Sequence, residues 1–149
     1  MHGYYKDQEE TDAVFKDGWF HTGDMAVVDA EGYITIVDRK KDIIISGGEN
    51  ISSVEVEKVI QDHPDVLEVV VVGIPNEKWG ESPLALVVLK PGRTPSEKEI
   101  IDHVRQRLAH YKAPKQVEFR DELPKGGTGK ILKRHLREPY WAEFEKKVH

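Results

Sequence analysis

The sequence predicts an α+β fold, in which helices pack on a small sheet of about three mainly antiparallel strands and a β-hairpin precedes the sheet. Two apolar, β-branched runs at 66–74 and 82–89 predict neighbouring strands, and the short connection between them favours antiparallel pairing. Two segments with capping-box spacing, one from Ser52 and one from Ser96, predict helix starts before and after these strands. This order of elements is typical of a small α+β layer.

The amino-terminal residues 1–37 predict a β-hairpin rather than the beginning of a domain. Residues 25–28 are apolar, residues 29–32 are turn-like, and residues 33–37 are strand-like. An isolated hairpin is only marginally stable in water. We therefore expect this segment to be the tail of a preceding domain, or to fold back on the domain that follows.

A charged joint at 38–42 leads into the segment around which the following domain is organised. A short β-branched strand at 43–45 is followed by a glycine-rich loop at 46–49, and Ser52 then begins a helix. We expect residues 38–42 to join the hairpin segment to a complete small domain at 43–149.

Two further elements complete the predicted domain. Apolar residues on one face predict an amphipathic helix after Ser96, and residues 116–120 predict another short strand. A loop at 125–130 follows, and its glycines predict mobility. Lys130 lies at the far end of this loop, where a cation can approach an anion.

Composition and charge exclude several classes of protein. The 149 residues include no cysteine and carry a formal net charge of −5, which excludes disulfides and thiolate metal sites and argues against a nucleic-acid partner. No apolar run approaches the roughly 20 residues of a membrane span, and no secretory signal is visible. We expect a cytoplasmic protein without a membrane span. The seven histidines show no metal-ligand spacing, so we predict no metal site.

Positive charge is concentrated in residues 110–149, where Lys and Arg outnumber Asp and Glu, whereas the rest of the chain is acidic. A local cationic segment suits an anionic small molecule or an acidic neighbouring surface. The solvated end of an amphipathic helix gives the same pattern, and the sequence leaves both interpretations open.

Three further positions each have a functional and a structural interpretation. The loop at 46–49 could let a ligand approach the backbone closely, or it could be a plain turn. Asp24 could accept hydrogen bonds from a vicinal diol, or it could cap a turn. Arg39 could bind a sugar or a phosphate, or it could form a surface ion pair.

The glycine–lysine loop at 125–130 is not a Walker phosphate loop. That pattern requires a glycine five positions before Gly129 and a Ser or Thr after the lysine, and the chain has Pro124 and Ile131 there. A GxxG string like that of RNA-binding KH domains occurs at 126–129, but a strand and a proline precede it instead of a helix. The string alone is a weak indication of RNA binding.

Five motifs follow one another along the chain: GWFHTGD at 18–24, DRKKD at 38–42, SGGENI at 46–51 with EVE at 55–57, GIP at 73–75 with WGE at 79–81, and LPKGGTGKI at 123–131. In this order they closely resemble the carboxy-terminal part of the adenylate-forming (acyl-activating) superfamily, and the wording is most similar to that of fatty acyl-CoA synthetases. The resemblance covers nearly the whole chain.

The resemblance implies an AMP-dependent synthetase that converts a carboxylate and ATP to acyl-AMP and pyrophosphate, and then transfers the acyl group to coenzyme A. In this superfamily the small carboxy-terminal domain pivots between the two half-reactions, which implies a hinge at 38–42 and a mobile carboxy-terminal domain at 43–149. By resemblance, Lys130 is the catalytic lysine that reaches the substrate carboxylate and the α-phosphate during adenylation. A cation in that place offsets the repulsion between two anions.

The resemblance also implies roles for five other residues. Asp24 and Arg39 would bind the nucleotide, Lys41 would be the hinge residue, and Gly47 and Gly48 would line the coenzyme A channel after the pivot. One position departs from the pattern: the chain has an asparagine at 50, where some relatives have an arginine that could meet coenzyme A phosphates. Lys112 or other cations of the basic tail would have to make that contact.

The superfamily supplies the phosphate loop, the adenine pocket, the magnesium-holding acid and the acyl tunnel from a preceding domain that is not in this sequence. We therefore expect ATP/AMP and coenzyme A as substrates, a Mg²⁺ ion in the parent enzyme but not bound by this chain, and the amino-terminal domain as partner. We expect the chain to be inactive alone. The alternative is a stand-alone binding module that docks on a separate adenylation domain or a carrier protein.

Overall fold

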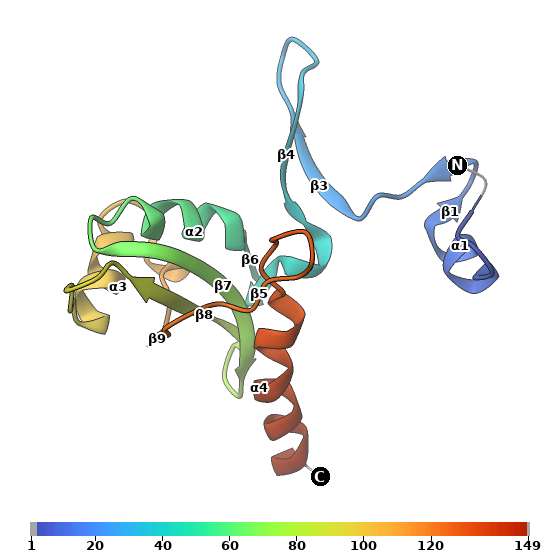
Figure 1. Ribbon diagram of the computed structural model, residues 1–149. Coiled ribbons are helices and arrows are strands. Elements are labelled where there is room, and N and C mark those ends of the chain that lie inside the picture. Colours follow the sequence, from blue (N-terminus) through green and yellow to red (C-terminus); the bar gives the residue numbers. More distant parts are fainter. Residues whose placement is uncertain (1–2, 149) are drawn as a thin grey trace. The chain divides into compact units, whose positions relative to one another are not determined.

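A computed structural model describes residues 3–148, and the chain divides into two compact units, Met1–Lys41 and Asp42–His149 (Figure 1). The division falls within the segment predicted to be a hinge, whose movement stays a prediction. Each unit is described by itself.

The first unit is a set of short elements that includes the expected hairpin. Its elements are α1 (Gln8–Val14), β1 (Phe15–Lys16), β2 (Trp19–Phe20), β3 (Asp24–Val28) and β4 (Ile34–Arg39). Strands β3 and β4 pair antiparallel, from Asp24 opposite Arg39 to Val28 opposite Ile34. The hairpin leaves large apolar side chains exposed, including Val28, Tyr33 and Ile34. A short helix, α1, was not predicted; the Asp7 side chain caps it by accepting the Glu10 amide.

The second unit contains the sheet and three of the helices. Its elements are β5 (Ile44–Ser46), β6 (Glu49–Ile51), α2 (Ser53–Gln61), β7 (Val66–Asn76), β8 (Gly80–Leu89), α3 (Glu97–Arg105), the 3₁₀ turn His110–Lys112, β9 (Gln116–Phe119) and α4 (Lys133–Val148); another 3₁₀ turn, Lys40–Asp42, spans the boundary between the units.

The sheet of the second unit confirms the α+β class and is larger than expected. It has five strands in the order β6-β5-β8-β7, with β9 paired to β8. All pairings are antiparallel except that between β8 and β9. The sheet exceeds the expected size partly because residues 49–51 turn back on β5 as a strand before the helix begins. Because β9 runs parallel to β8, helix α3 is needed to carry the chain back along the sheet.

Both faces of the sheet are buried. Along β7, Val69 and Val71 belong to the cluster that includes residues of α2 and α3, whereas Val70 and Val72 belong to the cluster on which α4 packs. Successive side chains of a strand point to opposite faces, so a continuous apolar run can supply both cores. Helices α2 and α3 therefore cover one face of the sheet and α4 covers the other (Figure 1).

Much of the basic carboxy-terminal segment forms helix α4, which begins at Lys133 and was not predicted as an element. It contains Pro139, which cannot donate a helical hydrogen bond. Two side chains tie the helix to the sheet: Tyr140 donates to Glu118 of β9 at 2.7 Å, and the Trp141 indole donates to the Gly73 carbonyl of β7 at 3.1 Å.

None of the helices described for residues 3–148 is sufficiently long and apolar to cross a membrane. Within the same residues, His, Asp and Glu side chains form no group of three or more that could hold a metal ion.

Candidate functional site

The predicted nucleotide-binding residues face each other across the hairpin of the first unit. Asp24 begins β3 and Arg39 ends β4, and the Arg39 Nε lies 3.6 Å from the Asp24 Oδ1. The side chains are 56% and 27% exposed for Arg39 and Asp24, respectively. An exposed pair of this kind contributes about 0–1 kcal/mol. A ligand that takes one of the two charges would therefore lose little by separating them.

Arg39 forms the surface ion pair of its structural interpretation, whereas Asp24 does not supply the side-chain acceptor of the turn, and nucleotide binding by the two residues stays a prediction. The Thr22 hydroxyl accepts the Asp24 amide at 3.2 Å, so Thr22 rather than Asp24 supplies the side-chain acceptor at this turn. At the same place the Lys40 amide donates to the Gly23 carbonyl at 2.8 Å, which closes the base of the hairpin. The Asp24 carboxylate is thus held at a strand start with only Arg39 as its ion-pair partner among the described residues.

An open cavity of about 640 Å³ lies beside the hairpin base within the first unit. It is lined by Tyr4, Glu10, Val14, Phe20, His21, Thr22, Gly23, Arg39, Lys40 and Lys41. Its volume falls in the range of about 300–1,000 Å³ that is usual for small-molecule sites. Arg39 and the predicted hinge residue Lys41 meet at this cavity, and an aromatic ring with neighbouring cations suits a nucleotide base with its phosphates.

The glycine pair of the second unit forms the two-residue turn between β5 and β6. Gly47 and Gly48 have φ values of 59° and 85°, a combination typical of the hairpin turn that matches the twist of its strands. The turn interpretation is therefore correct, but the two glycines differ. A Cβ on Gly47 would lie 2.8 Å from the Trp79 ring, whereas a Cβ on Gly48 would meet no atom within 4 Å. Only the Gly48 side of the turn is open to a close approach.

The end of the β7–β8 hairpin supports this turn. The Gly47 amide donates to the Trp79 carbonyl at 2.8 Å, and the Glu81 carboxylate accepts the Ile45 amide at 2.8 Å. A Cβ on Gly73 would lie 3.2 Å from that carboxylate, so the glycine leaves the space that Glu81 occupies. Trp79 and Glu81 were not predicted as site residues; the WGE motif was the only signal that pointed to them.

The loop that carries Lys130 is hydrogen-bonded across its base. The Gly126 amide donates to the Lys130 carbonyl at 2.8 Å, and the Leu132 amide donates to the Pro124 carbonyl at 3.0 Å. Gly129 has a φ of 78°, a conformation that favours glycine. The Lys130 side chain is exposed, and among the side chains described it has no ion-pair partner. The loop thus presents an available ammonium group on a defined backbone.

Lys112 is engaged within the fold. Its ammonium donates to the Glu55 carboxylate at 2.7 Å, and this hydrogen bond raises the pKa of Lys112 above its usual range. Any contact of Lys112 with coenzyme A would have to compete with Glu55.

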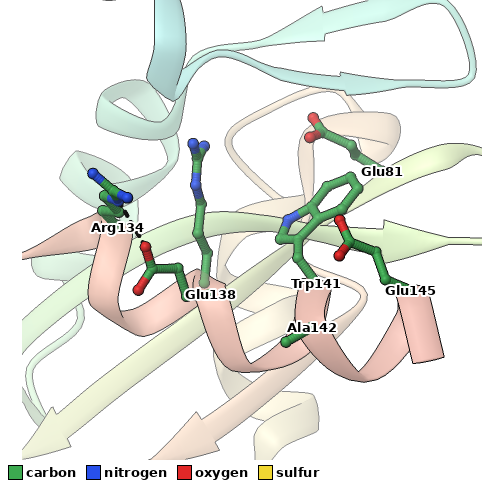
Figure 2. A pocket seen from close by; sticks show the side chains of 7 residues that line it. Glu81, Arg134, Glu138, Trp141, Ala142 and Glu145 are labelled. Atoms are coloured by element: carbon green, nitrogen blue, oxygen red, sulfur yellow. Dashed lines mark hydrogen bonds and ion pairs between the residues drawn. The ribbon is translucent and has the colours of Figure 1, made fainter.

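A further groove of about 540 Å³ lies along α4 and mixes charges of both signs (Figure 2). It is lined by Glu81, Arg134, Arg137, Glu138, Trp141, Ala142 and Glu145. Figure 2 shows the Trp141 ring between Glu81 and Glu145, with the Arg134–Glu138 pair toward the start of the helix. Because acids and bases alternate along it, this groove offers no field of one sign to a charged ligand.

The predicted site residues thus divide between the units. Asp24, Arg39 and Lys41 belong to the first unit, and Gly47, Gly48 and Lys130 to the second. Within the second unit, the glycine turn and the Lys130 loop are two separate loops of one folded body.

Comparison with known proteins adds the family. Residues 55–130 match the model of the AMP-binding enzyme C-terminal domain. A 2-methylpropanoate–CoA ligase from Humulus lupulus is 54% identical over 141 residues, which cover 93% of this chain and 25% of the relative. A trans-cinnamate:CoA ligase from Petunia hybrida, named as peroxisomal, is 51% identical over 93% of this chain. The chain spans about a quarter of the length of these curated relatives, which are acid–CoA ligases of various substrates.

Solved structures of similar proteins match nearly the whole of this chain as well. The ATP-bound MatB structure from Rhodopseudomonas palustris superposes with a TM-score of 0.86 at 40% identity and covers 93% of this chain and 28% of that one. A fatty acyl CoA synthetase from Mycobacterium tuberculosis has a TM-score of 0.71 at 49% identity, over 95% of this chain and 28% of that one.

Proposed function

The chain belongs to the AMP-binding enzyme C-terminal domain family of acyl-CoA ligases and acyl-activating enzymes, and from this premise we propose that it serves both half-reactions of an acid–CoA ligase. In the first, a carboxylate oxygen attacks the α-phosphate of ATP, giving acyl-AMP and pyrophosphate. In the second, the thiol of coenzyme A loses its proton and attacks the acyl carbonyl, releasing AMP. The observation that supports the proposal is that one folded unit presents two separate loops, the Gly47–Gly48 turn between β5 and β6 and the loop with the exposed Lys130.

Lys130 acts in adenylation. Its exposed ammonium, on a loop with a hydrogen-bonded base, is free to approach the anions of the reacting carboxylate and α-phosphate. A cation held there stabilises charge that builds up in the transition state, in a place where little reorganisation is needed. Asp24 and Arg39 hold the nucleotide, with the Asp24 carboxylate accepting from the ribose hydroxyls in place of Arg39.

The glycine turn acts in thioester formation. Gly48, with no atom near the position of its absent side chain, lets the pantetheine arm pass close to the backbone, and Gly47 holds the turn against Trp79. Lys41, at the boundary between the units, is the hinge residue. The second unit rotates about it, so that the glycine turn replaces the Lys130 loop at the active site. The Mg²⁺ that we expect to accompany ATP would be held by the amino-terminal part of the ligase and would offset negative charge on the phosphates, and we assign none of its ligands to this chain.

The acid that we propose is a fatty acid. The amino-acid sequences of the five motifs favour this class, and one similar structure is that of a fatty acyl CoA synthetase. Cytoplasmic location stays a prediction, because several relatives are named as peroxisomal.

The test uses a hybrid ligase, in which this chain replaces the matching carboxy-terminal part of the Humulus lupulus 2-methylpropanoate–CoA ligase. Pyrophosphate release with ATP, Mg²⁺ and 2-methylpropanoate reports adenylation, and the thioester step is followed from supplied acyl-adenylate and coenzyme A. We expect no activity from the chain alone and activity from the hybrid. Acyl-adenylate formed by the purified chain alone would contradict this assignment.

Within the hybrid, Lys130→Ala should slow adenylation by about 10²-fold, equivalent to about 3 kcal/mol, as deletion of a transition-state donor does. Thioester formation should change much less. The matched control is Lys115→Ala, which removes another exposed lysine of the second unit. Equal losses in both half-reactions would remove the case for a lysine that acts in one pose.

A second candidate function is the stand-alone binding module, which is favoured by the complete core of the second unit. Adding the chain in trans to the relative's amino-terminal part separates the two. Activity in trans supports the ligase domain and shows that the hinge need not be covalent. Inactivity in trans and in the hybrid, with both proteins folded, favours the module. The DNA upstream of Met1 gives an independent answer, since an open frame that continues into a Ser/Thr/Gly-rich loop supports the ligase.

A further inference from the structure

A polar cluster at the start of α4 connects the Lys130 loop to the core of the second unit. The Lys133 ammonium lies 2.8 Å from the Glu57 carboxylate of α2 and donates to the hydroxyl of Ser53, also at 2.8 Å. The same Glu57 oxygen accepts the amide of Val71 in β7 at 2.9 Å. Lys133, the first residue of α4, thus connects this helix to α2 directly and to β7 through Glu57.

This cluster differs from the other ion pairs of the helix in its burial. The Lys133 and Glu57 side chains are each 20% exposed, whereas the neighbouring Arg134–Glu138 pair is 83% and 53% exposed. Ser53 is fully buried. A half-buried charge that loses its partner is left poorly solvated, so this pair resists separation far more than an exposed pair does.

The Lys130 loop lies between two ion pairs with the rest of the second unit, of which the Lys133–Glu57 pair is the more buried. Lys133 follows Lys130 by three residues, and on the other stem Lys125 pairs with Glu68 of β7. Between the stems, Gly126, Gly127 and Gly129 give the backbone little stiffness of its own. Backbone hydrogen bonds close the base of the loop, and Leu123 and Ile131 pack on the core below it. The attachments of the stems add to these contacts in setting where the loop sits relative to the sheet.

We propose that Lys133, through Glu57, is a positioning residue that holds the Lys130 loop in place for adenylation. The inference rests on the adenylation role proposed for Lys130. Glu57 and Ser53 hold the Lys133 ammonium, so we assign Lys133 no direct contact with substrate. Its effect passes through Lys130, and a displacement of about 1 Å at a reacting group can cost about 10²-fold in rate.

The test compares four variants. Lys133→Met removes the charge and keeps most of the stem; Glu57→Gln keeps an oxygen for the Val71 amide while removing the ion pair; Lys133→Arg restores a cation; and Arg134→Met is the matched control from an exposed pair on the same helix. The first measurement needs no activity. Hydrogen exchange of the Gly126 and Gly129 amides, which close the loop, is followed in the 149-residue chain together with its unfolding midpoint.

We expect Lys133→Met and Glu57→Gln to speed exchange at Gly126 and Gly129, and Arg134→Met to leave it unchanged. In the hybrid ligase, Lys133→Met should slow adenylation by about 10- to 100-fold while thioester formation stays close to the parent rate. Lys133→Arg should recover part of the loss.

The decisive variant is the double change Lys130→Ala with Lys133→Met. If Lys133 acts through Lys130, the double variant adenylates no more slowly than Lys130→Ala alone. A further loss in the double variant, an equal loss in both half-reactions, or unchanged loop exchange in Lys133→Met would overturn the positioning role. A Lys130→Ala ligase with normal adenylation would instead overturn the function proposed for Lys130, and the exchange data would still decide whether the cluster holds the loop.

Discussion

Substituting the two glycines of the β5–β6 turn should separate a packing cost from a backbone cost. Both residues have positive φ values, and the left-handed conformation costs a residue with a side chain about 1–2 kcal/mol. Gly47→Ala adds a Cβ only 2.8 Å from the Trp79 ring, so the ring or the turn must shift. Overpacking of this kind costs about 1–3 kcal/mol. We therefore expect a total of about 2–5 kcal/mol for Gly47→Ala and about 1–2 kcal/mol for Gly48→Ala.

The assay is thermal and urea unfolding of the chain followed by circular dichroism. For a domain near 100 residues, 1 kcal/mol corresponds to about 4–8 °C in Tm, so the two variants should be clearly resolved. Trp79→Ala supplies the control, because it removes the ring that the new Cβ would meet and keeps the carbonyl that accepts the Gly47 amide. In that background the cost of Gly47→Ala should fall to that of Gly48→Ala.

Equal costs for the two alanines, or a Gly47→Ala cost that Trp79→Ala does not reduce, would refute the packing argument.

The same positions separate stability from function in the hybrid ligase. A bulkier change at Gly48, such as Gly48→Val, should slow thioester formation more than adenylation, because its open side is where we propose that the pantetheine arm passes.

Two further predictions concern the helices of the second unit. Burial, chiefly, lowers the pKa of His103 below its ordinary value of about 6.5, with Arg107 and His63 acting in the same direction while a hydrogen bond to the Val59 carbonyl and the charge of Asp62 oppose it. Below about pH 6.5 the unfolded chain therefore binds more protons than the folded chain. The contribution of His103 to the free energy of unfolding is full above about pH 6.5 and is lost as the pH falls toward the lowered pKa. Urea midpoints at pH 8 and pH 5.5 should show this loss, and a His103→Gln chain with the same pH dependence would contradict it. Ser96→Ala should destabilise the chain by about 1 kcal/mol, because Ser96 caps α3 in a reciprocal capping box, and an unchanged unfolding midpoint would count against that cap.

Local patterns in the sequence were sufficient where the physical cause is local. The predicted caps at Ser52 and Ser96 are present, since a hydroxyl three residues before an amide needs no tertiary partner to meet it. The run at 66–74 predicted a strand because an apolar, β-branched segment of that length must be buried on both faces. The β6 strand was missed because only three residues follow the glycine turn before the helix.

Helix α4 shows the limit of periodicity. Its apolar face is interrupted by charges and by Pro139, so the segment has no clear helical pattern of its own. Its helical state depends on the sheet face formed by Val70, Val72 and Leu86, on which Leu136 and Tyr140 pack. No pattern within 133–148 contains that information.

The class of fold, the two helix caps, the central strands and the family could be predicted from local patterns and from five ordered motifs. The same motifs pointed to the candidate residues Asp24, Arg39, Lys41, Gly47, Gly48 and Lys130. The way in which the second unit supports its two loops depends on tertiary contacts that no local pattern contains. Gly47 packs on Trp79 while Gly48 stays open, and Glu57 receives both Lys133 and the Val71 amide. The physical reason is sequence distance: these partners come from different elements, and only the folded sheet brings their polar atoms and rings into contact.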